Sequence, residues 1–249
     1  MDNLQSEMYT EFDKDPTAIT AFIRWLAETY HLPQPLHVLD IGCGPGRMLA
    51  EYHKLGWRIT GMEPDPDFHQ SASETISEIP DSRLYKGGFG DIDFENEMHL
   101  ITAINNPFSY LLDVPSRLDA LARVYKALTP GGVFFLEVTN FLYKLQHFEP
   151  VTVQNKEIDG ETVLHVMENH FDVENARWVL RDQYVVEGKP EVIVKEHEQA
   201  VTALPELLYF FEQQGFTSIQ TYNSYTARQS EPITGKTILI SAQKPTNDG

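Results

Sequence analysis

The sequence predicts an α/β protein built on a doubly wound, mostly parallel sheet, with a smaller antiparallel sheet inserted after the fifth strand. Up to about residue 140, short apolar runs alternate with segments of helical periodicity, which is typical of β-α-β units. Between residues 148 and 200, four segments with period-2 alternation follow one another across short turns. The chain has 249 residues, 41% of them apolar, which suits one α/β domain with an insertion.

The first part of the chain predicts alternating helices and parallel strands. Pro33 and Pro35 end the first helix, and Gly56 ends the second. The strand at 98–105 is almost continuously apolar, as expected for a parallel strand covered on both faces. The expected helices span 8–30, 45–56, 67–78 and 115–128, and the expected strands span 36–41, 57–63, 83–86, 98–105 and 133–138. In such sheets, ligands bind outside the carboxyl ends of the strands.

The inserted segment predicts an antiparallel meander, because turn residues separate neighbouring strands by only a few positions. Its expected strands span 151–156, 162–172, 177–186 and 192–200, and a helix at 205–214 and strands at 216–222 and 236–243 follow them. We therefore expect an N-terminal helical cap at 1–35, a core formed by 36–147 and 201–249, and an inserted sheet at 148–200. The inserted sheet is expected to serve either as a lid or as a dimerisation element of a homodimer.

Three glycines form a tight turn after the first strand, at Gly42, Gly44 and Gly46, with Asp40 two residues before the first of them. Glycine lets the backbone turn sharply and lets a ligand approach it closely. The spacing Gly-x-Gly-x-Gly differs from the dinucleotide fingerprint Gly-x-Gly-x-x-Gly, and no Lys-Ser or Lys-Thr follows to make a P-loop. Cys43 lies inside the turn with no base near it in sequence, so we interpret it as a small residue beside a ligand.

This segment resembles motif I of the class I S-adenosylmethionine-dependent methyltransferases. The resemblance runs from about residue 36 to 138, with weaker support to 243, and includes the turn at 128–132. It implies a Rossmann-like methyltransferase sheet of seven strands with the last pair antiparallel, and S-adenosyl-L-methionine as cofactor. In that family the acidic residue and the glycine turn hold the methionine part and the ribose side of the cofactor. The matching residues here are Asp40, Gly42, Cys43, Gly44 and Gly46.

The resemblance implies further cofactor-binding residues at the ends of the next strands. They are Tyr9, Glu63, Pro64, Asp91, Ile92 and Asn105. Glu63 ends the second strand, where a carboxylate can accept both ribose hydroxyls. Asp91 matches the acid that accepts from the adenine amino group, with Ile92 packing on the ring, and Asn105 matches a residue that touches the methionine part. Tyr9 belongs to the N-terminal aromatics that close over the cofactor, where a ring can shield a sulfonium.

The methyl acceptor determines whether a base is needed. A hydroxyl acceptor needs a general base, whereas an amine must arrive deprotonated. The residues expected to carry catalysis follow or end the fifth strand, where the insertion begins, and are Glu137, Tyr143 and His147. His165 and His170 lie five positions apart on one expected strand, so they should point to opposite faces and not form a metal site.

The composition excludes some partners. The formal net charge of −18, from 37 acidic and 19 basic residues, predicts repulsion from nucleic acid and from anionic membrane surfaces. The single cysteine cannot form an intramolecular disulfide. The N-terminus lacks the apolar region of a signal peptide, and no run is long enough to span a bilayer. These features predict a cytoplasmic protein that acts on a small molecule.

The sequence therefore predicts a methyltransferase that transfers the methyl group of S-adenosylmethionine to an amine or a hydroxyl of a small molecule. One alternative is an aminopropyl-transferring enzyme of the same fold. Such enzymes carry acidic residues after the fourth strand, where this chain has Asn-Asn-Pro-Phe-Ser at 105–109. The other alternative is a module that binds the cofactor without catalysis.

Overall fold

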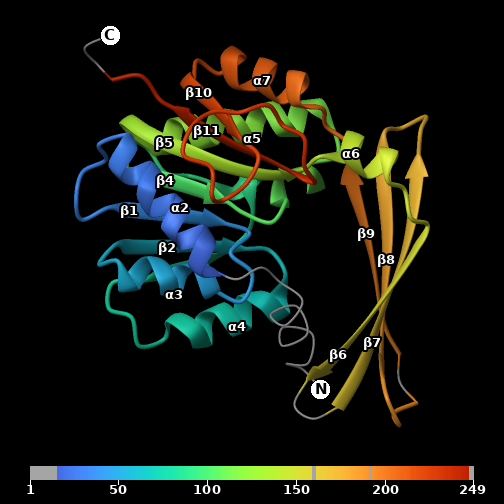
Figure 1. Cartoon of the computed structure of the whole chain (residues 1–249). Coiled ribbons are helices and arrows are strands. Elements are labelled where there is room, and N and C mark those ends of the chain that lie inside the picture. Colours follow the sequence, from blue (N-terminus) through green and yellow to red (C-terminus); the bar gives the residue numbers. More distant parts are fainter. Residues whose placement is uncertain (1–15, 159–160, 191, 247–249) are drawn as a thin grey trace.

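The structure is a computed structural model that describes residues 16–158, 161–190 and 192–246 (Figure 1). It contains a seven-stranded sheet with helices on both faces and a separate four-stranded sheet beside it. The strand order of the larger sheet is β10-β11-β5-β4-β1-β2-β3. Its strands are β1 (His37–Ile41), β2 (Arg58–Glu63), β3 (Arg83–Lys86), β4 (Met98–Ala103), β5 (Leu128–Thr139), β10 (Thr217–Tyr222) and β11 (Thr237–Gln243).

Strands β1 to β5 are parallel, whereas β11 runs antiparallel to both β5 and β10. The predicted seven-stranded sheet with an antiparallel last pair is therefore confirmed. The helices are α2 (Pro16–Thr29), α3 (Arg47–Lys54), α4 (Pro66–Ile76), α5 (Val114–Ala127), α6 (Phe141–Gln146) and α7 (Leu204–Gln213), with short 3-10 turns η1 (Phe89–Asp91) and η2 (Pro107–Tyr110).

Two apolar layers hold the helices to the sheet. Helices α2, α3 and α4 pack on one face, and α5 and α7 pack on the other. All five residues of β1 are buried; Val38 belongs to the first layer, whereas Leu39 and Ile41 belong to the second. The alternation follows from the period of two along a strand, so a strand that is buried on both sides contributes side chains to both layers.

Local signals set the ends of the helices. Asp65 caps α4, because its Oδ1 accepts hydrogen bonds from the backbone N–H groups of Asp67 (2.9 Å) and Phe68 (3.1 Å). Pro66 occupies the first turn, where no N–H is needed. Since α4 begins directly after β2, this cap also fixes the backbone that follows Glu63.

The structure differs from the expected elements at β5 and α6. Strand β5 begins at Leu128, earlier than predicted, because Leu128 already pairs with Met98 before a register shift leads to the pairing of Val133 with Leu100. Gly131, with φ of +80°, lies inside this irregular stretch. Helix α6 was not predicted, because it has only six residues and its Phe141 side chain is buried against Trp178, far along the chain.

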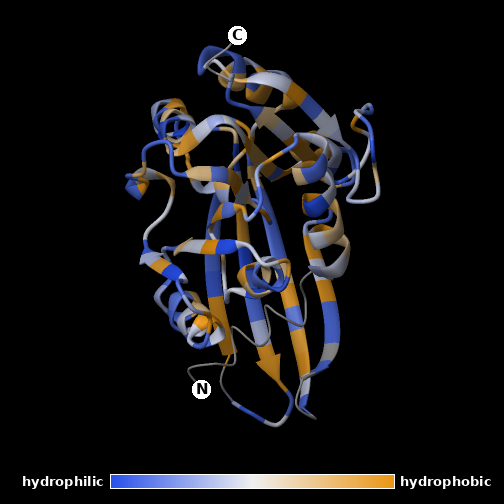
Figure 2. Ribbon diagram, turned by 90° about the vertical axis from the view of Figure 1, so that its left-hand side faces the viewer, coloured by the Kyte–Doolittle hydropathy of each residue, from blue (hydrophilic) through white to orange (hydrophobic). Residues whose placement is uncertain are grey.

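The second sheet is an antiparallel meander in the order β6-β7-β8-β9, as predicted. Its strands are β6 (Val151–Ile158), β7 (Glu161–Asp172), β8 (Arg177–Val186) and β9 (Val192–Ala200). It stands to the right of the larger sheet in Figure 1, and Figure 2 shows its strands passing repeatedly between hydrophilic and hydrophobic residues.

The two faces of this second sheet differ. The face that carries Val163, Trp178 and Val186 is buried at those positions and contacts the core through Phe141, and we call it the inner face. The opposite, outer face exposes valines with 44–56% of their surface accessible, namely Val151, Val153, Val192 and Val194. Among the described residues, no helix is both long and apolar enough to cross a membrane.

Candidate active site at the carboxyl edge of the sheet

The glycine turn lies between β1 and α3, and the backbone of β2 holds it in place. The N–H groups of Gly42 and Cys43 both donate to the Met62 carbonyl, at 2.8 and 3.1 Å. Gly42 has φ of +69°, and a Cβ added there would come within 2.8 Å of the Pro107 Cβ. The turn therefore needs glycine both for its left-handed backbone and for its close approach to the loop after β4.

Glu63 joins the end of β2 to this turn. Its Oε2 accepts from the Gly44 N–H at 2.8 Å, and its Oε1 accepts from the Asp65 N–H at 2.9 Å. Only 5% of the residue is exposed, and burial raises the pKa of the carboxyl group above its ordinary value. Each carboxylate oxygen can accept a further hydrogen bond, so the group can still bind a ligand hydroxyl. Pro64, the next residue, is exposed.

Asp40 is a buried acid beneath the turn. Its side chain is 3% exposed, and its Oδ1 accepts from the Thr102 hydroxyl at 2.7 Å. Burial is the main reason that the pKa of Asp40 rises to about 7, and the negative charge of Glu63 adds to the effect. A cation bound nearby will therefore favour the ionised form of Asp40.

The predicted adenine-binding pair lies in the loop after β3. Asp91 is exposed, and its Oδ2 accepts from the Gly88 N–H at 2.9 Å. Ile92 is only 2% exposed and belongs to the apolar layer beneath α5. The structure thus brings the acid to the surface of the loop and places the isoleucine side chain inside the core. The predicted Tyr9 lies outside the described residues.

Asn105 and Glu137 form one connected unit. Asn105 follows β4 in a left-handed conformation with φ of +66°, and its N–H donates to Glu137 Oε2 at 3.0 Å. Glu137 is 2% exposed, and the Tyr225 hydroxyl donates to the same oxygen. The contacts of Glu137 thus shape the loop that carries Asn105.

The other two predicted catalytic residues lie apart from the glycine turn, on and after α6. The rings of Tyr143 and His147 stack with centroids 4.1 Å apart. His147 is exposed, and its Nδ1 lies 2.9 Å from the Tyr143 carbonyl oxygen, which can only accept, so this nitrogen donates.

The carboxyl edge therefore gathers the predicted cofactor residues, because β4, β1 and β2 are neighbours in the sheet. Asp40, Glu63 and Asn105 come from these three strands or the loops directly after them. This edge is also where doubly wound sheets bind ligands. Among the described residues, no group of three or more histidine, cysteine, aspartate or glutamate side chains could hold a metal ion.

Sequence reasoning missed a polar cluster on the inner face of the second sheet. Asp182 lies 2.6 Å from His165 and 3.6 Å from His197, and the His197 ring lies 3.3 Å from the Tyr110 hydroxyl. The sequence contains a signal for the pairing of His165 with Asp182. A tight turn centred on 174–175 pairs His165 with Tyr184, which puts Asp182 on the same face as His165.

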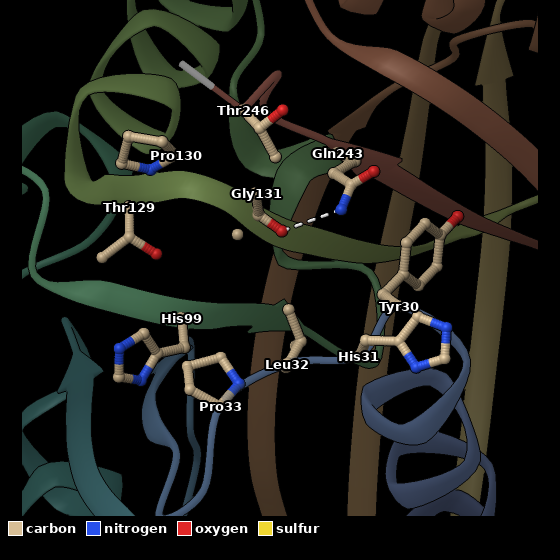
Figure 3. A pocket seen from close by; sticks show the side chains of 11 residues that line it. Tyr30, His31, Leu32, Pro33, His99, Thr129, Pro130, Gly131, Gln243 and Thr246 are labelled. Carbon is tan, nitrogen blue, oxygen red and sulfur yellow. Dashed lines mark hydrogen bonds between the residues drawn. The ribbon is translucent and has the colours of Figure 1, made fainter. Parts of the chain in front are cut away.

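A separate pocket of about 470 Å³ lies at the opposite edge of the sheet (Figure 3). His99, at the start of β4, and the residues 129–132, at the start of β5, line it, and Gln243 closes one side by donating to the Gly131 carbonyl at 2.9 Å. Since the glycine turn follows the carboxyl end of β1, this pocket is not the site described above.

Comparisons with known proteins agree with this geometry. Residues 38–132 match the family described as "Methyltransferase domain". This part of the chain is therefore similar to a methyltransferase domain. The matched residues begin in β1 and end in β5, so they contain the glycine turn, Glu63 and Asn105.

Two relatives of this chain are named as methyltransferases of small molecules. One is the dTDP-4-amino-2,3,4,6-tetradeoxy-D-glucose N,N-dimethyltransferase of Saccharopolyspora spinosa, 24% identical over 43% of this chain and 41% of the relative. Another is the trans-aconitate 2-methyltransferase of Rhodopseudomonas palustris, 27% identical over 59% of this chain and 54% of the relative. The chain thus matches about half the length of these two relatives.

Solved structures match the chain over nearly its whole length. An S-adenosylmethionine-dependent methyltransferase from Clostridium acetobutylicum superimposes with a TM-score of 0.83 at 18% identity, covering 98% of both chains. An amino pentose methyltransferase from Micromonospora echinaspora, solved with S-adenosylmethionine bound, gives a TM-score of 0.78 at 20% identity over 97% of this chain and 96% of that one. The chain therefore has the class I methyltransferase fold, including the four-stranded sheet.

Proposed function

We propose that this protein uses S-adenosylmethionine to methylate a small molecule. The observation that carries the proposal is the hydrogen bond from the Gly44 N–H to Glu63, which joins the glycine turn of β1 to the acid at the end of β2. A ligand at this edge can contact the backbone of the glycine turn and the Glu63 carboxylate at the same time. S-adenosylmethionine supplies a methyl group already activated on a sulfonium, so the protein mainly aligns the reactants and excludes water.

The residues present fit this cofactor. A Cβ at Gly42 would fill the space beside Pro107, so the turn leaves its backbone accessible only because it is glycine. S-adenosylmethionine carries a positive sulfonium, and the buried acids Asp40 and Glu63 supply negative charge near the turn. Asp91, Ile92 and the remaining predicted contacts complete the proposed cofactor site.

For the acceptor, we propose an amine of a small molecule, with an amino sugar as the first class to test. The relative from Saccharopolyspora spinosa and the neighbour from Micromonospora echinaspora are both named for amino-sugar methylation. The net charge of −18 supports a small molecule over nucleic acid. The trans-aconitate relative favours oxygen methylation as the second candidate.

We further propose that the inserted sheet works as a lid over the acceptor. Its inner face contacts the loops of the carboxyl edge: Lys195 lies 3.6 Å from Asp65, and the Asn106 side chain donates to Gln199 at 3.2 Å. Tyr143 and His147 follow β5 near this sheet and stay proposed participants in catalysis, as does Glu137 at the end of that strand. A lid built from an insertion would give substrate specificity to a shared fold.

Calorimetric titration tests the cofactor. Wild type should bind S-adenosylmethionine and its demethylated product, and NAD should not compete. Glu63→Ala should lose this binding, because it removes the acid that bridges turn and strand. The matched control is Glu78→Ala, since Glu78 is an exposed glutamate just after α4.

Failure of wild type to bind S-adenosylmethionine, or a preference for NAD, would contradict the proposal. Turnover is measured next, as release of the demethylated product with amino sugars and hydroxy acids as acceptors. Binding without turnover would favour the module that binds the cofactor without catalysis. Transfer from decarboxylated S-adenosylmethionine would favour the aminopropyl-transferring alternative.

A further inference from the structure

A chain of four polar side chains runs across the inner face of the second sheet. It consists of Tyr110, His197, Asp182 and His165, and we call it the inner-face relay. The Tyr110 hydroxyl lies 3.3 Å from His197 Nδ1, and His197 Nε2 lies 3.6 Å from Asp182 Oδ2. The other carboxylate oxygen, Asp182 Oδ1, lies 2.6 Å from His165 Nε2.

The relay stands over the edge where the proposed cofactor site lies. Tyr110 belongs to η2, directly after the loop that carries Asn105, and is 47% exposed. On either side of the relay, β9 is tied to the same edge through the contacts of Lys195 with Asp65 and of Gln199 with the β4 loop. The relay therefore begins beside the loops of the carboxyl edge and ends inside the second sheet.

Packing alone does not explain these residues. At three other positions, Val163, Trp178 and Val186, the inner face buries apolar side chains at 0–3% exposure. Asp182 and His165 are each 6% exposed, and burying a pair of polar side chains generally gives no more stability than burying apolar side chains of similar volume. The His165 ring is also held flat against Tyr184, with centroids 4.3 Å apart and an interplanar angle of 12°. A polar chain fixed in this way is suited to moving a proton.

We propose that the inner-face relay receives the proton that the amine acceptor releases, with Tyr110 touching the acceptor and His197 holding the proton at Nδ1. This inference rests on the proposed function and deepens it. Methyl transfer forms the new N–C bond and breaks the S–C bond, whose electron pair stays on sulfur. As the N–C bond forms, one proton leaves the nitrogen for the Tyr110 oxygen while the Tyr110 hydroxyl proton passes to His197. The proton finally goes to solvent.

The charges around His197 suit this role. The groups facing it are Asp182 from β8, Tyr110 from η2, Lys195 from its own strand and Asp65 from the N-cap of α4. Burial is the main cause that lowers the pKa of His197, and the negative charge of Asp182 opposes that shift. A lowered pKa favours the neutral imidazole, which can accept a proton, and the Asp182 carboxylate 3.6 Å from Nε2 favours the tautomer with its proton there and Nδ1 open toward Tyr110. Asp182 acts here as a positioning residue.

The matched variants come from the same sheet. His197→Gln and Tyr110→Phe break the relay at its accessible end, and Asp182→Asn keeps the shape of the buried pair. His170→Gln is the control, because His170 lies exposed on the outer face of β7. All four variants should bind S-adenosylmethionine within about twofold of wild type by calorimetry. If wild type itself does not bind S-adenosylmethionine, the proposed function is refuted.

The first readout is nuclear magnetic resonance of the histidine rings in the full chain with the demethylated product bound. The probe is the 4-amino sugar nucleotide of the Saccharopolyspora relative, and its 4-hydroxy analogue is the control ligand. We expect the amine to shift the His197 and His165 signals and to leave His170 unchanged. Shifts at neither relay histidine, or shifts with the hydroxy analogue alone, would overturn the inference.

The second readout is the pH dependence of kcat/KM with the same amine. His197→Gln should lower the rate about 100-fold at neutral pH and leave only the acidic limb that protonation of the free amine itself causes, as loss of a general base does. Asp182→Asn should move the limb that His197 causes to lower pH, because its charge favours the protonated imidazole. A merely structural role would leave the limb in place. Wild-type rates and an unchanged limb in His197→Gln would refute the relay.

Discussion

Replacing Gly42 by alanine tests whether the glycine turn is shaped by close approach of the backbone as well as by its left-handed conformation. Gly42 has φ of +69°, and its added Cβ would lie 2.8 Å from the Pro107 Cβ. The left-handed conformation costs an alanine about 1–2 kcal/mol. Forcing a methyl group into a packed contact adds about 1–3 kcal/mol. We therefore expect Gly42→Ala to lower the free energy of unfolding by about 2–5 kcal/mol.

Gly56 provides the matched control. It has φ of +77°, but nothing lies within 4 Å of an added Cβ. Gly56→Ala should therefore cost only the backbone part, about 1–2 kcal/mol. The difference between the two variants isolates the contact with Pro107. In a domain of this size each kcal/mol corresponds to about 2–4 °C in Tm, so thermal unfolding together with urea unfolding resolves it.

The same pair of variants links stability to binding. In Gly42→Ala the turn or the loop after β4 must shift, so the affinity for S-adenosylmethionine should fall at least about tenfold, which corresponds to about 1.4 kcal/mol. Gly56→Ala, at the far end of α3, should bind like wild type. Equal destabilisation of the two variants, with equal affinities, would refute the steric part of the reasoning.

Three further predictions concern the buried groups around this edge. The pKa of Asp40 in the native protein is raised to about 7, so the protein should lose about 4 kcal/mol of stability as the pH rises from about 4 through 7. Asp40→Asn should flatten this pH dependence of the free energy of unfolding, measured in urea. Parallel pH curves for wild type and variant would contradict the prediction. Cys43 is buried and burial raises the pKa of its thiol, so a disulfide reagent should react with it only in denaturant, whereas rapid native labelling would be the contrary result. Tyr225→Phe removes a hydrogen-bond donor to Glu137, so it should lower the free energy of unfolding by about 1–3 kcal/mol in the wild-type background and by less in the Glu137→Gln background. A double-mutant cycle that shows no coupling between the two residues would contradict this prediction.

Part of the candidate site could be predicted because it is local in sequence. The glycine turn, Glu63 and Asn105 each follow a strand, and parallel strands bring their carboxyl ends to one edge whatever the details of packing. The role of Glu137 could not be predicted in this way. Its contact with Tyr225 joins residues 88 positions apart, and nothing in either segment indicates the other.

The sequence alone determined the order and type of nearly all elements, including the strand at 83–86 and the inserted strands at 177–186 and 192–200. Hydrophobic periodicity and turn residues act over a few positions, and they suffice to place strands and the turn between them. Only the tertiary structure decided that Tyr110 meets His197, 87 residues away. That contact depends on how the second sheet packs on the turn after β4. It requires both the strand register, which sets the face on which His197 lies, and the position of the second sheet against this turn.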